Sequence, residues 1–457
     1  MTRYVQHLTC GLAALGLSLM LLASPANAQS TIRDAETEEL LREYGTPLFT
    51  AAGLTPGSVD LYIVNDPSLN AFVYGGQNMF IHTGLMLAAE TPNELIGVMA
   101  HETGHIAGGH LARRSDAMSN VTIPAYLGAA IGIGLMIAGM PEAGMAAMGI
   151  SQQVAQREFL SYTRIQEAAA DQAAMTYMNQ TDQSGEGLLT FFDRFRDQEI
   201  LAGVNQDPYV RSHPLNQERI ALLERRVLNS SNLGTPDSDD SLHRFAMVQA
   251  KLTGFLDNPY LVLRRYPEDD LSMPAHYARA VAYFREGRTD LALSQIDHLI
   301  GIEPENAFYH ELRGQILFEG ARLEDAIVSY RTSSDLRPEI ALLRINVAQA
   351  LLASADDEGD TAANQEALRN LQYAVAHDNT SAFAWHQMSI AYSRTGNIGM
   401  AELAIAEQYY TVHRMNEARE FAIRARGKLP EDGVSWNRAM DIIYLTGQGR
   451  TRDGRPG

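Results

Sequence analysis

Cysteine is almost absent from this chain of 457 residues: the single Cys10 lies close to the N-terminus. Beyond it the chain can form no disulfide and use no thiol chemistry. Positive charge is also scarce, with 36 Lys and Arg against 55 Asp and Glu, a formal net charge of −19. That balance argues against nucleic acid and against anionic membrane surfaces as partners.

Residues 1–28 have the pattern of a secretory signal peptide. Arg3 precedes an apolar run over residues 8–23, which small residues follow and which ends in Ala26-Asn27-Ala28. The run is too short for a lasting membrane anchor, and the A-x-A pattern predicts cleavage near Ala28, before Gln29. A secreted chain without disulfides is expected in the bacterial periplasm.

The remaining length allows two or three domains. We expect one mixed domain over residues 29–230, a linker over 231–242 with Ser, Asn, Asp, Gly and Pro composition, an all-α domain over 243–445 and a disordered tail over 446–457. The predicted fold class is therefore α+β, mostly α, with a small sheet confined to the first domain.

The second domain repeats itself with a fixed period. Pro304 and Pro338 are 34 positions apart, as are Ala292 and Ala326, and the two segments align without a gap. This pattern resembles the tetratricopeptide repeat, a helix-turn-helix unit; an unrelated helical bundle is the alternative. Residues 341–380 look like a further repeat with an acidic insertion, and 243–272 like a degenerate first one. Such solenoids bind peptides or proteins.

The stretch "VMAHETGHIAGGH" carries the chemistry of the first domain. His101 and His105 are four residues apart, so both can reach one ion from the same face of a helix, and Glu102 can contact a water on that ion. This is the H-E-x-x-H arrangement, for which Zn²⁺ is the usual metal. Two ordinary core histidines are the alternative. Gly104 costs about 1 kcal/mol against alanine inside a helix, which a close approach beside a crowded site would explain.

A catalytic zinc site needs a third protein ligand and one open position. His110 is a poor candidate, because in a continuing helix it points roughly 140° away from His105; we expect a helix-end or surface histidine. Glu167 and Asp171 are better placed, four apart on one face of an alanine-rich helix. One can ligate zinc while the other accepts the free ring N–H of a ligating histidine. Taken alone, such a pair is an ordinary solvated helix face.

The segments "AHETGH" and "EAAAD" together resemble the HtpX and CAAX-prenyl-protease type of zinc peptidase, a gluzincin-type fold. "NAFVYGGQNMFIHTGL" and "RSHPLNQERI" are similar to further elements of that family, and the second places His213 and Arg219. The resemblance covers roughly residues 60–225. With the signal peptide and the repeats, the chain resembles the periplasmic BepA-like proteases. Thr103 departs from the bulkier aliphatic residue of the family, which affects packing.

The resemblance implies a role for each site residue. His101, His105 and Glu167 would hold one Zn²⁺ per chain, Asp171 would lie behind them, and Glu102 would be the general base. His213 would either donate to the oxyanion or occupy the open position of a resting enzyme; a capped surface histidine before Pro214 is the alternative.

Two further segments bear on substrate and membrane. Residues 70–81 are expected to form an edge strand near the metal, with Asn70, Gly75 and Gly76 along it, where an extended substrate adds by backbone hydrogen bonds; a paired internal strand is the alternative. Residues 121–140 carry no charge. We expect a helical hairpin over 121–150 that covers the cleft or makes peripheral membrane contact, against a true span or a core helix.

The predicted function is a secreted zinc endopeptidase that cleaves unfolded or misassembled proteins. The resemblance suggests quality control of outer-membrane proteins, with the repeats docking clients or the outer-membrane assembly machinery. The alternative is a periplasmic chaperone or scaffold whose zinc site is largely closed.

Overall fold

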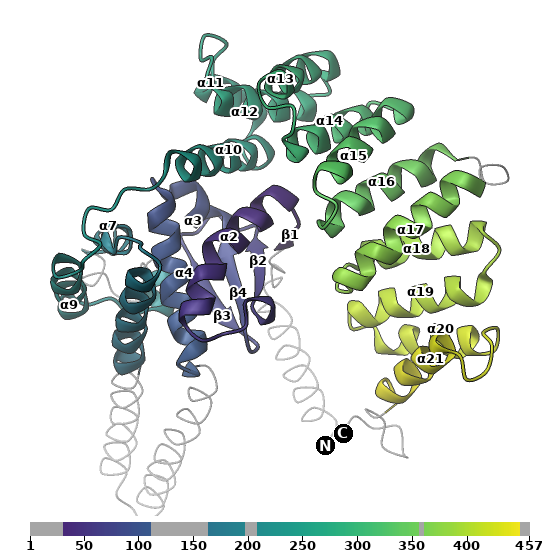
Figure 1. The fold of residues 1–457 in the computed structure, drawn as a ribbon, viewed down its shortest axis with the longest axis horizontal. Coiled ribbons are helices and arrows are strands. Elements are labelled where there is room, and N and C mark those ends of the chain that lie inside the picture. Colours follow the sequence, from purple (N-terminus) through teal and green to yellow (C-terminus); the bar gives the residue numbers. More distant parts are fainter. Residues whose placement is uncertain (1–30, 111–162, 197–207, 356–360, 448–457) are drawn as a thin grey trace, which may run out of the picture. The chain divides into compact units, whose positions relative to one another are not determined.

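A computed structural model describes residues 31–110, 163–196, 208–355 and 361–447. The predicted signal peptide and the segment 121–150 lie outside these residues, as do positions 448–457 of the predicted tail. Contacts divide the chain into two compact units: residues 1–33 with 45–235, and residues 34–44 with 236–457. The boundary therefore falls inside one helix, α2 (Ala35–Ala51). The predicted class, mostly α with a small sheet, is confirmed (Figure 1).

The first unit contains the sheet. Its four strands run in the order β1 (Thr31–Ile32), β2 (Asp60–Val64), β4 (Asn78–His82) and β3 (Ala71–Tyr74). β2 and β4 are parallel, whereas β1 pairs antiparallel with β2 and β3 antiparallel with β4. β3 is an edge of this sheet. The 3-10 turn η1 (Pro56–Ser58) precedes β2, and α3 (Thr83–Ala88) follows β4.

The prediction of a single edge strand over residues 70–81 is wrong in extent. The segment is a hairpin in which β3 is the edge and β4 is internal. Gly75 and Gly76 form its turn with φ of 66° and 106°, a conformation that glycine adopts without a steric penalty. The glycines reverse the chain, so they cannot extend the edge.

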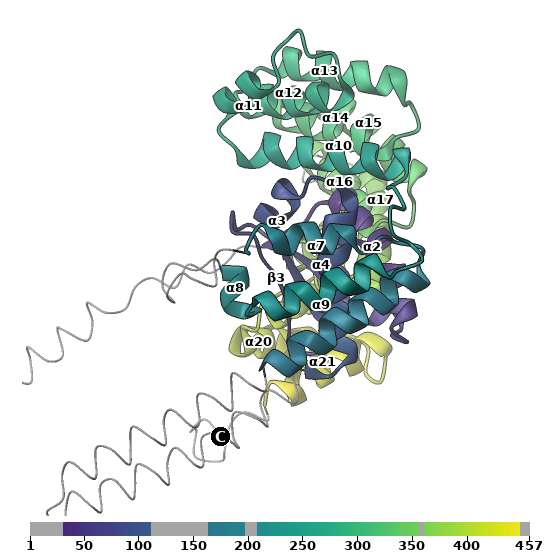
Figure 2. The ribbon, with the colours of Figure 1, turned by 90° about the vertical axis from the view of Figure 1, so that its left-hand side faces the viewer.

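The helix α4 (Pro92–Ala107) is the centre of the first unit. Thr91 caps it by accepting a hydrogen bond from the backbone N–H of Glu94, with Pro92 at the first position. Every residue from Pro92 to His105 is buried, and α4 packs against β3 and against α7 (Glu186–Asp193). α7 in turn contacts α9 (Gln217–Leu228), which follows the short α8 (Pro208–Ser212) (Figure 2). A further helix is described over residues 163–180.

The second unit is a succession of antiparallel helices, as the repeat in the sequence predicts. Three hairpins begin at Met273, Ala307 and Ala341, which are equally spaced along the chain. Neighbouring helices pack on small side chains, and an alanine-rich core runs through the stack. The helices are α10 (Asp239–Leu256), α11 (Pro259–Arg265), α12 (Met273–Arg285), α13 (Thr289–Ile302), α14 (Ala307–Glu319), α15 (Leu323–Leu336), α16 (Ala341–Ser354), α17 (Thr361–His377), α18 (Ala382–Arg394), α19 (Ile398–Thr411), α20 (Met415–Arg426) and α21 (Val434–Leu445).

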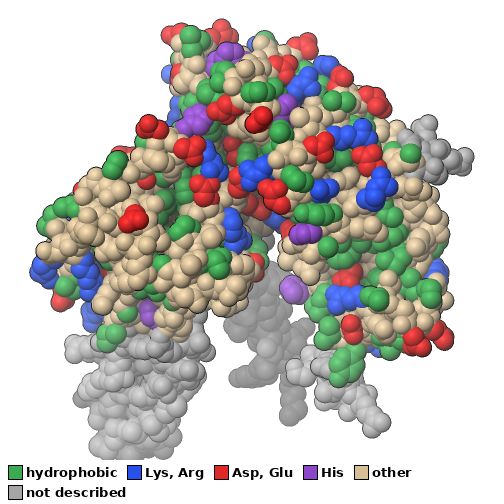
Figure 3. All heavy atoms as spheres, in the orientation of Figure 1, with side chains coloured by type: hydrophobic (Ala, Val, Ile, Leu, Met, Phe, Trp, Pro, Cys, Tyr) green, Lys and Arg blue, Asp and Glu red, His purple; other side chains and the backbone are tan. Residues whose placement is uncertain are grey.

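The segment 231–242, predicted as a linker, is helical from Asp239 onwards. Ser238 caps α10 by accepting from the N–H of Ser241, and Asp239 and Asp240 in the first turn favour the positive end of the helix dipole. Figure 3 shows acidic and basic side chains interspersed over the exposed surface of the repeats. In the part of the chain that the structure describes, no helix is long and apolar enough to cross a bilayer.

Candidate metal centre

Four side chains from three parts of the first unit converge on one point. His101 and His105 come from α4, Glu167 from the helix over 163–180, and His213 from the residue after α8. All four are buried, and one ligand atom from each lies within 4.8 Å of the other three. Among the described residues this is the one group of at least three His, Cys, Asp and Glu side chains with such spacing.

The spacing within the group fits a small tetrahedral cation. The Nε2 atoms of His101 and His105 are 3.0 Å apart, and Glu167 oxygens lie 3.3 Å and 3.6 Å from them. Nδ1 of His213 lies 3.2 Å from Glu167 Oε2 and 3.4 Å from His101 Nε2. Ligands about 2.0–2.1 Å from a tetrahedral zinc are roughly 3.3 Å apart. The donor set of imidazole nitrogens and a carboxylate is also one that zinc prefers.

The charges within the group also fit a bound cation. Burial raises the pKa of carboxyl groups, but at Glu167 the His213 ring and hydrogen bonds from His101 and His105 outweigh it and hold the pKa well below its usual range. Burial lowers the pKa of His105 to about 3. At His101 burial is outweighed by Asp171 and Glu167, which raise the pKa to about 10. The carboxylates therefore stabilise positive charge at this point, where a divalent cation would supply it.

Asp171 lies behind the first histidine. Its Oδ1 is 3.0 Å from Nδ1 of His101, on the side of the ring away from the Nε2 atom that faces the cluster. Arg219 binds the same carboxylate through two hydrogen bonds of 2.9 Å and 2.8 Å and lies 3.2 Å from Glu167. Burial would raise the pKa of Asp171, but Arg219 and His101 outweigh it and lower the pKa. Asp171 is thus held ionised, with its carboxylate facing the ring nitrogen of His101 that points away from the cluster.

Gly104 lets the two helices meet closely enough for this geometry. A Cβ at position 104 would lie 2.9 Å from the backbone oxygen of Ala170 and 3.2 Å from the Cβ of Ala173. The close approach predicted from the sequence is therefore present. It brings Glu167 and Asp171 opposite the histidines of α4.

Glu102 lies beside the cluster and is not one of its four members. Its carboxyl group is fully buried, Oε1 is 3.4 Å from Nε2 of His213, and neither oxygen accepts a hydrogen bond from the described residues. Burial raises its pKa, which His213 and His101 partly counter. Glu102, His105 and His213 line a cavity of about 70 Å³ together with Phe72 and Val73 of β3. That volume holds about two water molecules.

The sequence predicts that His110 is either a helix-end or a surface histidine. It lies just after the end of α4, and because it is buried, the prediction of a surface position is wrong. The helix does not continue: α4 ends at Ala107, and Gly109 turns the chain with φ of 60°. His110 therefore folds back, is buried, and places Nδ1 2.9 Å from Nδ1 of His105. It is outside the four-residue cluster and contacts the far nitrogen of a member. The paired glycines at 108 and 109 were the signal in the sequence for this helix end.

Tyr209 was not anticipated. Its ring stacks on His213 with 4.8 Å between centroids, within a group of aromatic side chains from α7 and its end. The backbone N–H of His213 also donates to the carbonyl of Tyr209 over 2.7 Å. The remaining expected residues lie apart from the cluster: Asn70 precedes β3 and accepts from Ser212, while Gly75 and Gly76 stand at the hairpin turn.

Comparison with known proteins agrees with this geometry. Residues 35–227 match the model of peptidase family M48. The chain is 24% identical over 394 residues to the beta-barrel assembly-enhancing protease of Escherichia coli (strain K12), covering 85% of this chain and 78% of that protein. A relative from Vibrio cholerae is 27% identical over 428 residues, with 92% and 82% covered. The mitochondrial metalloendopeptidase OMA1 of Schizosaccharomyces pombe is 24% identical over 177 residues, 39% of this chain and 49% of that one. Residues 35–227 are therefore similar to peptidase family M48, and with the named proteases among the relatives this supports a metalloendopeptidase.

Proposed function

We propose that His101, His105 and Glu167 hold one zinc ion per chain, and that the enzyme cleaves unfolded or misassembled proteins. The observation that carries the proposal is the convergence of four ligand atoms within 4.8 Å beside a buried glutamate. A zinc ion bound there would lower the pKa of a bound water to about 7 and polarise the scissile carbonyl.

Glu102 is the general base in this proposal. It takes a proton from the attacking water and delivers it to the leaving amine. Two features support the role: both carboxylate oxygens are free of hydrogen bonds from the described residues, and the side chain lines the small cavity beside His105 and His213. Asp171 accepts the ring N–H of His101, so that Nε2 remains the ligating atom.

His213 fills the fourth ligand position when the enzyme rests. In support, its Nδ1 lies as close to Glu167 and to His101 as the ligand atoms lie to one another. A histidine in that position excludes the attacking water, so substrate entry requires this ring to move away. After it has moved away, the same ring can donate a hydrogen bond to the oxyanion that forms on the scissile carbonyl. A restrained resting state suits a protease with broad substrate choice.

Substrate binds along β3. The strand is an edge of the sheet, and Phe72 and Val73 on it line the cavity that Glu102 and His105 also line. An extended chain can add to such an edge through backbone hydrogen bonds, which read conformation more than sequence. Unfolded segments are therefore the fitting substrate class. Gly75 and Gly76 shape the hairpin that ends the strand.

The cellular role follows from the relatives. The names of two of them concern assembly of beta-barrel proteins, and we place this chain in the periplasm in outer-membrane protein quality control. The peptidase domain spans residues 29–230, and the repeats over 243–445 dock clients or partners. A scaffold with a closed metal site would have no use for Glu102, which is why the peptidase is favoured.

The test separates chemistry from metal binding. Glu102→Gln keeps the shape and the ligands but removes the base, so casein cleavage should fall by roughly 1,000-fold or more while zinc content stays at about one per chain. Glu218→Gln, on the exposed face of α9, is the matched control and should cleave like the parent. Cleavage by Glu102→Gln at the parent rate would overturn the assignment.

A further inference from the structure

An acidic segment from the start of α2 packs into the repeat unit. Residues 34–44, with the sequence DAETEELLREY, belong by their contacts to the same compact unit as α10 to α21. Asp34 caps the helix by accepting from the N–H of Thr37 over 2.8 Å. A single helical segment is therefore held by repeat helices that come much later in the sequence.

Lys251 of α10 is the centre of this contact. The side chain is buried and is one of only two lysines in the chain, and its Nζ lies 2.5 Å from Asp34 and 3.3 Å from Glu36. Tyr277 of α12, also buried, donates its hydroxyl to Glu36 over 2.6 Å. A buried ammonium is stable only when paired. The two carboxylates of the segment lie nearest to it, and Glu311 of α14 adds a third carboxylate at 3.8 Å.

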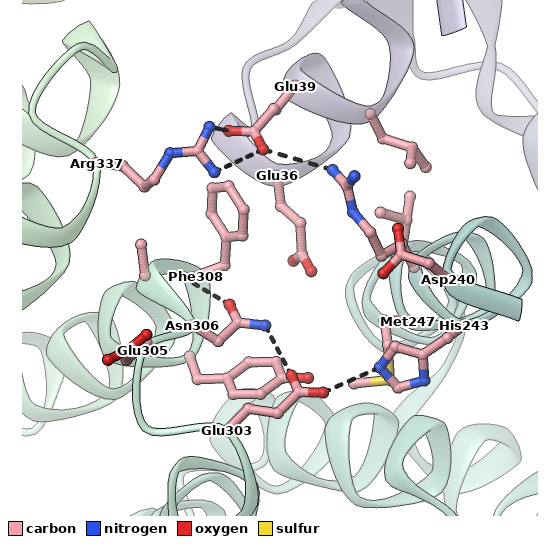
Figure 4. A pocket seen from close by; sticks show the side chains of 15 residues that line it. Glu36, Glu39, Asp240, His243, Met247, Glu303, Glu305, Asn306, Phe308 and Arg337 are labelled. Carbon is pink, nitrogen blue, oxygen red and sulfur yellow. Dashed lines mark hydrogen bonds and ion pairs between the residues drawn. The ribbon is translucent and has the colours of Figure 1, made fainter. Parts of the chain in front are cut away.

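A second set of contacts, from two arginines, binds the next turn of the segment. Arg337, at the end of α15, donates a hydrogen bond to Oε1 of Glu39 over 2.8 Å and forms an ion pair with its Oε2 at 2.5 Å, a charge-assisted contact with the carboxylate (Figure 4). Arg244 of α10 reaches both Glu39 and Glu43. The apolar face adds Ala35, which packs with Phe308 of α14 and Leu343 of α16.

Apart from Arg337, these contacts come from α10, α12, α14 and α16, the first helices of successive hairpins. In a repeat solenoid, equivalent positions of successive units line one continuous surface, which is the surface used for binding. The segment therefore lies where a repeat domain takes a ligand. A cavity of about 290 Å³ beside it, which Glu36, Glu39, His243 and Phe308 help to line, leaves room for a bulkier segment (Figure 4).

We infer that this surface is a recognition groove for an acidic, helix-forming segment, that residues 34–44 occupy it within the same chain, and that a partner with an acidic segment of this kind must displace them to dock. The inference rests on the docking role proposed for the repeats and names the chemistry of the partner. Covalent attachment gives residues 34–44 an effective concentration in the millimolar range, so only a strong or multivalent partner competes.

The experiment uses the full chain with Glu102→Gln, so that no peptide is cut, and a fluorescent peptide of residues 31–46. The groove is vacated by Asp34→Asn, Glu36→Gln and Glu39→Gln, which keep the cap and the helix but remove three charges. The peptide should bind this variant roughly 10-fold or more tightly than it binds the chain with its own acids intact. Adding Lys251→Met should abolish the gain, and a peptide carrying Gln at positions 36 and 39 should not bind.

Absence of peptide binding to a vacated variant whose circular dichroism and thermal melt match the parent would overturn the inference, as would binding that Lys251→Met leaves unchanged. If the vacated variant does not fold, hydrogen exchange on the unaltered chain decides. Excess peptide should speed hydrogen exchange of the amides of residues 35–44, because it displaces this segment. An unchanged exchange rate would contradict displacement of the segment by the peptide. Casein cleavage by the parent chain reports separately on the peptidase.

Discussion

Asp171 Oδ1 lies 3.0 Å from Nδ1 of His101, on the side of the imidazole opposite to the atom that faces His105 and Glu167. One carboxylate of the E-x-x-x-D pair thus enters the ligand cluster while the other supports a ligand from behind.

Asp171→Asn should weaken zinc binding about 10- to 100-fold without removing a ligand, because the amide no longer fixes the ring N–H of His101. Zinc loss in a chelator competition measures the effect. Asp193→Asn, at an exposed pair with Arg196, is the control. Equal zinc retention by both variants would show that Asp171 serves the fold alone.

Glu167→Gln should strip zinc far more severely than His110→Ala. The first removes a charged ligand, whereas the second removes the 2.9 Å contact on the far nitrogen of His105 and leaves the four cluster residues in place, so it should cost about 10-fold in affinity. Metal analysis after dialysis distinguishes them. Similar zinc contents in the two variants would contradict the assignment of Glu167 as a ligand.

His213→Ala should raise basal casein cleavage and self-cleavage, because the proposed resting state has this ring in the fourth ligand position and the variant lacks it. A fall of roughly 100-fold with zinc retained would instead make His213 an oxyanion donor. Tyr209→Leu removes the ring stacked on His213 and should shift the rate in the same direction by a smaller factor. A parent-like rate in His213→Ala would exclude both roles.

The repeat unit should lose stability as the pH rises from 4.5 to about 7. Burial raises the pKa of Glu311 from 4.5 to about 7, with Lys251 partly offsetting it. The folded state therefore holds a proton at pH values between 4.5 and 7 where the unfolded chain has released it, so stability rises as the pH falls across that window. The melting temperature of Glu311→Gln should depend less on pH over this range than that of the parent. At about pH 8 the free energy of unfolding of the variant should be higher by about 1 kcal/mol. A parent-like pH profile would contradict the shift.

The local sequence determined the elements that carry the chemistry. Four-residue spacing puts His101 with His105, and Glu167 with Asp171, on single helix faces, because that geometry depends on the backbone alone. The period of the repeats likewise predicts the helix hairpins, since successive units have a small residue at the equivalent position, Ala280, Gly314 and Ala348.

Only the tertiary structure decided how these elements meet. The spacing allowed either carboxylate to face the metal, and the packing of the 163–180 helix on Gly104, with Arg219 holding Asp171, places Glu167 forward. The position of the His110 side chain depended on where α4 ends, and the positive φ of Gly109 turns the chain so that this side chain points back towards His105. The contact of residues 34–44 with Lys251 joins positions that are far apart in the sequence. No local pattern encodes such a contact, because it exists only once the repeats have stacked into a surface.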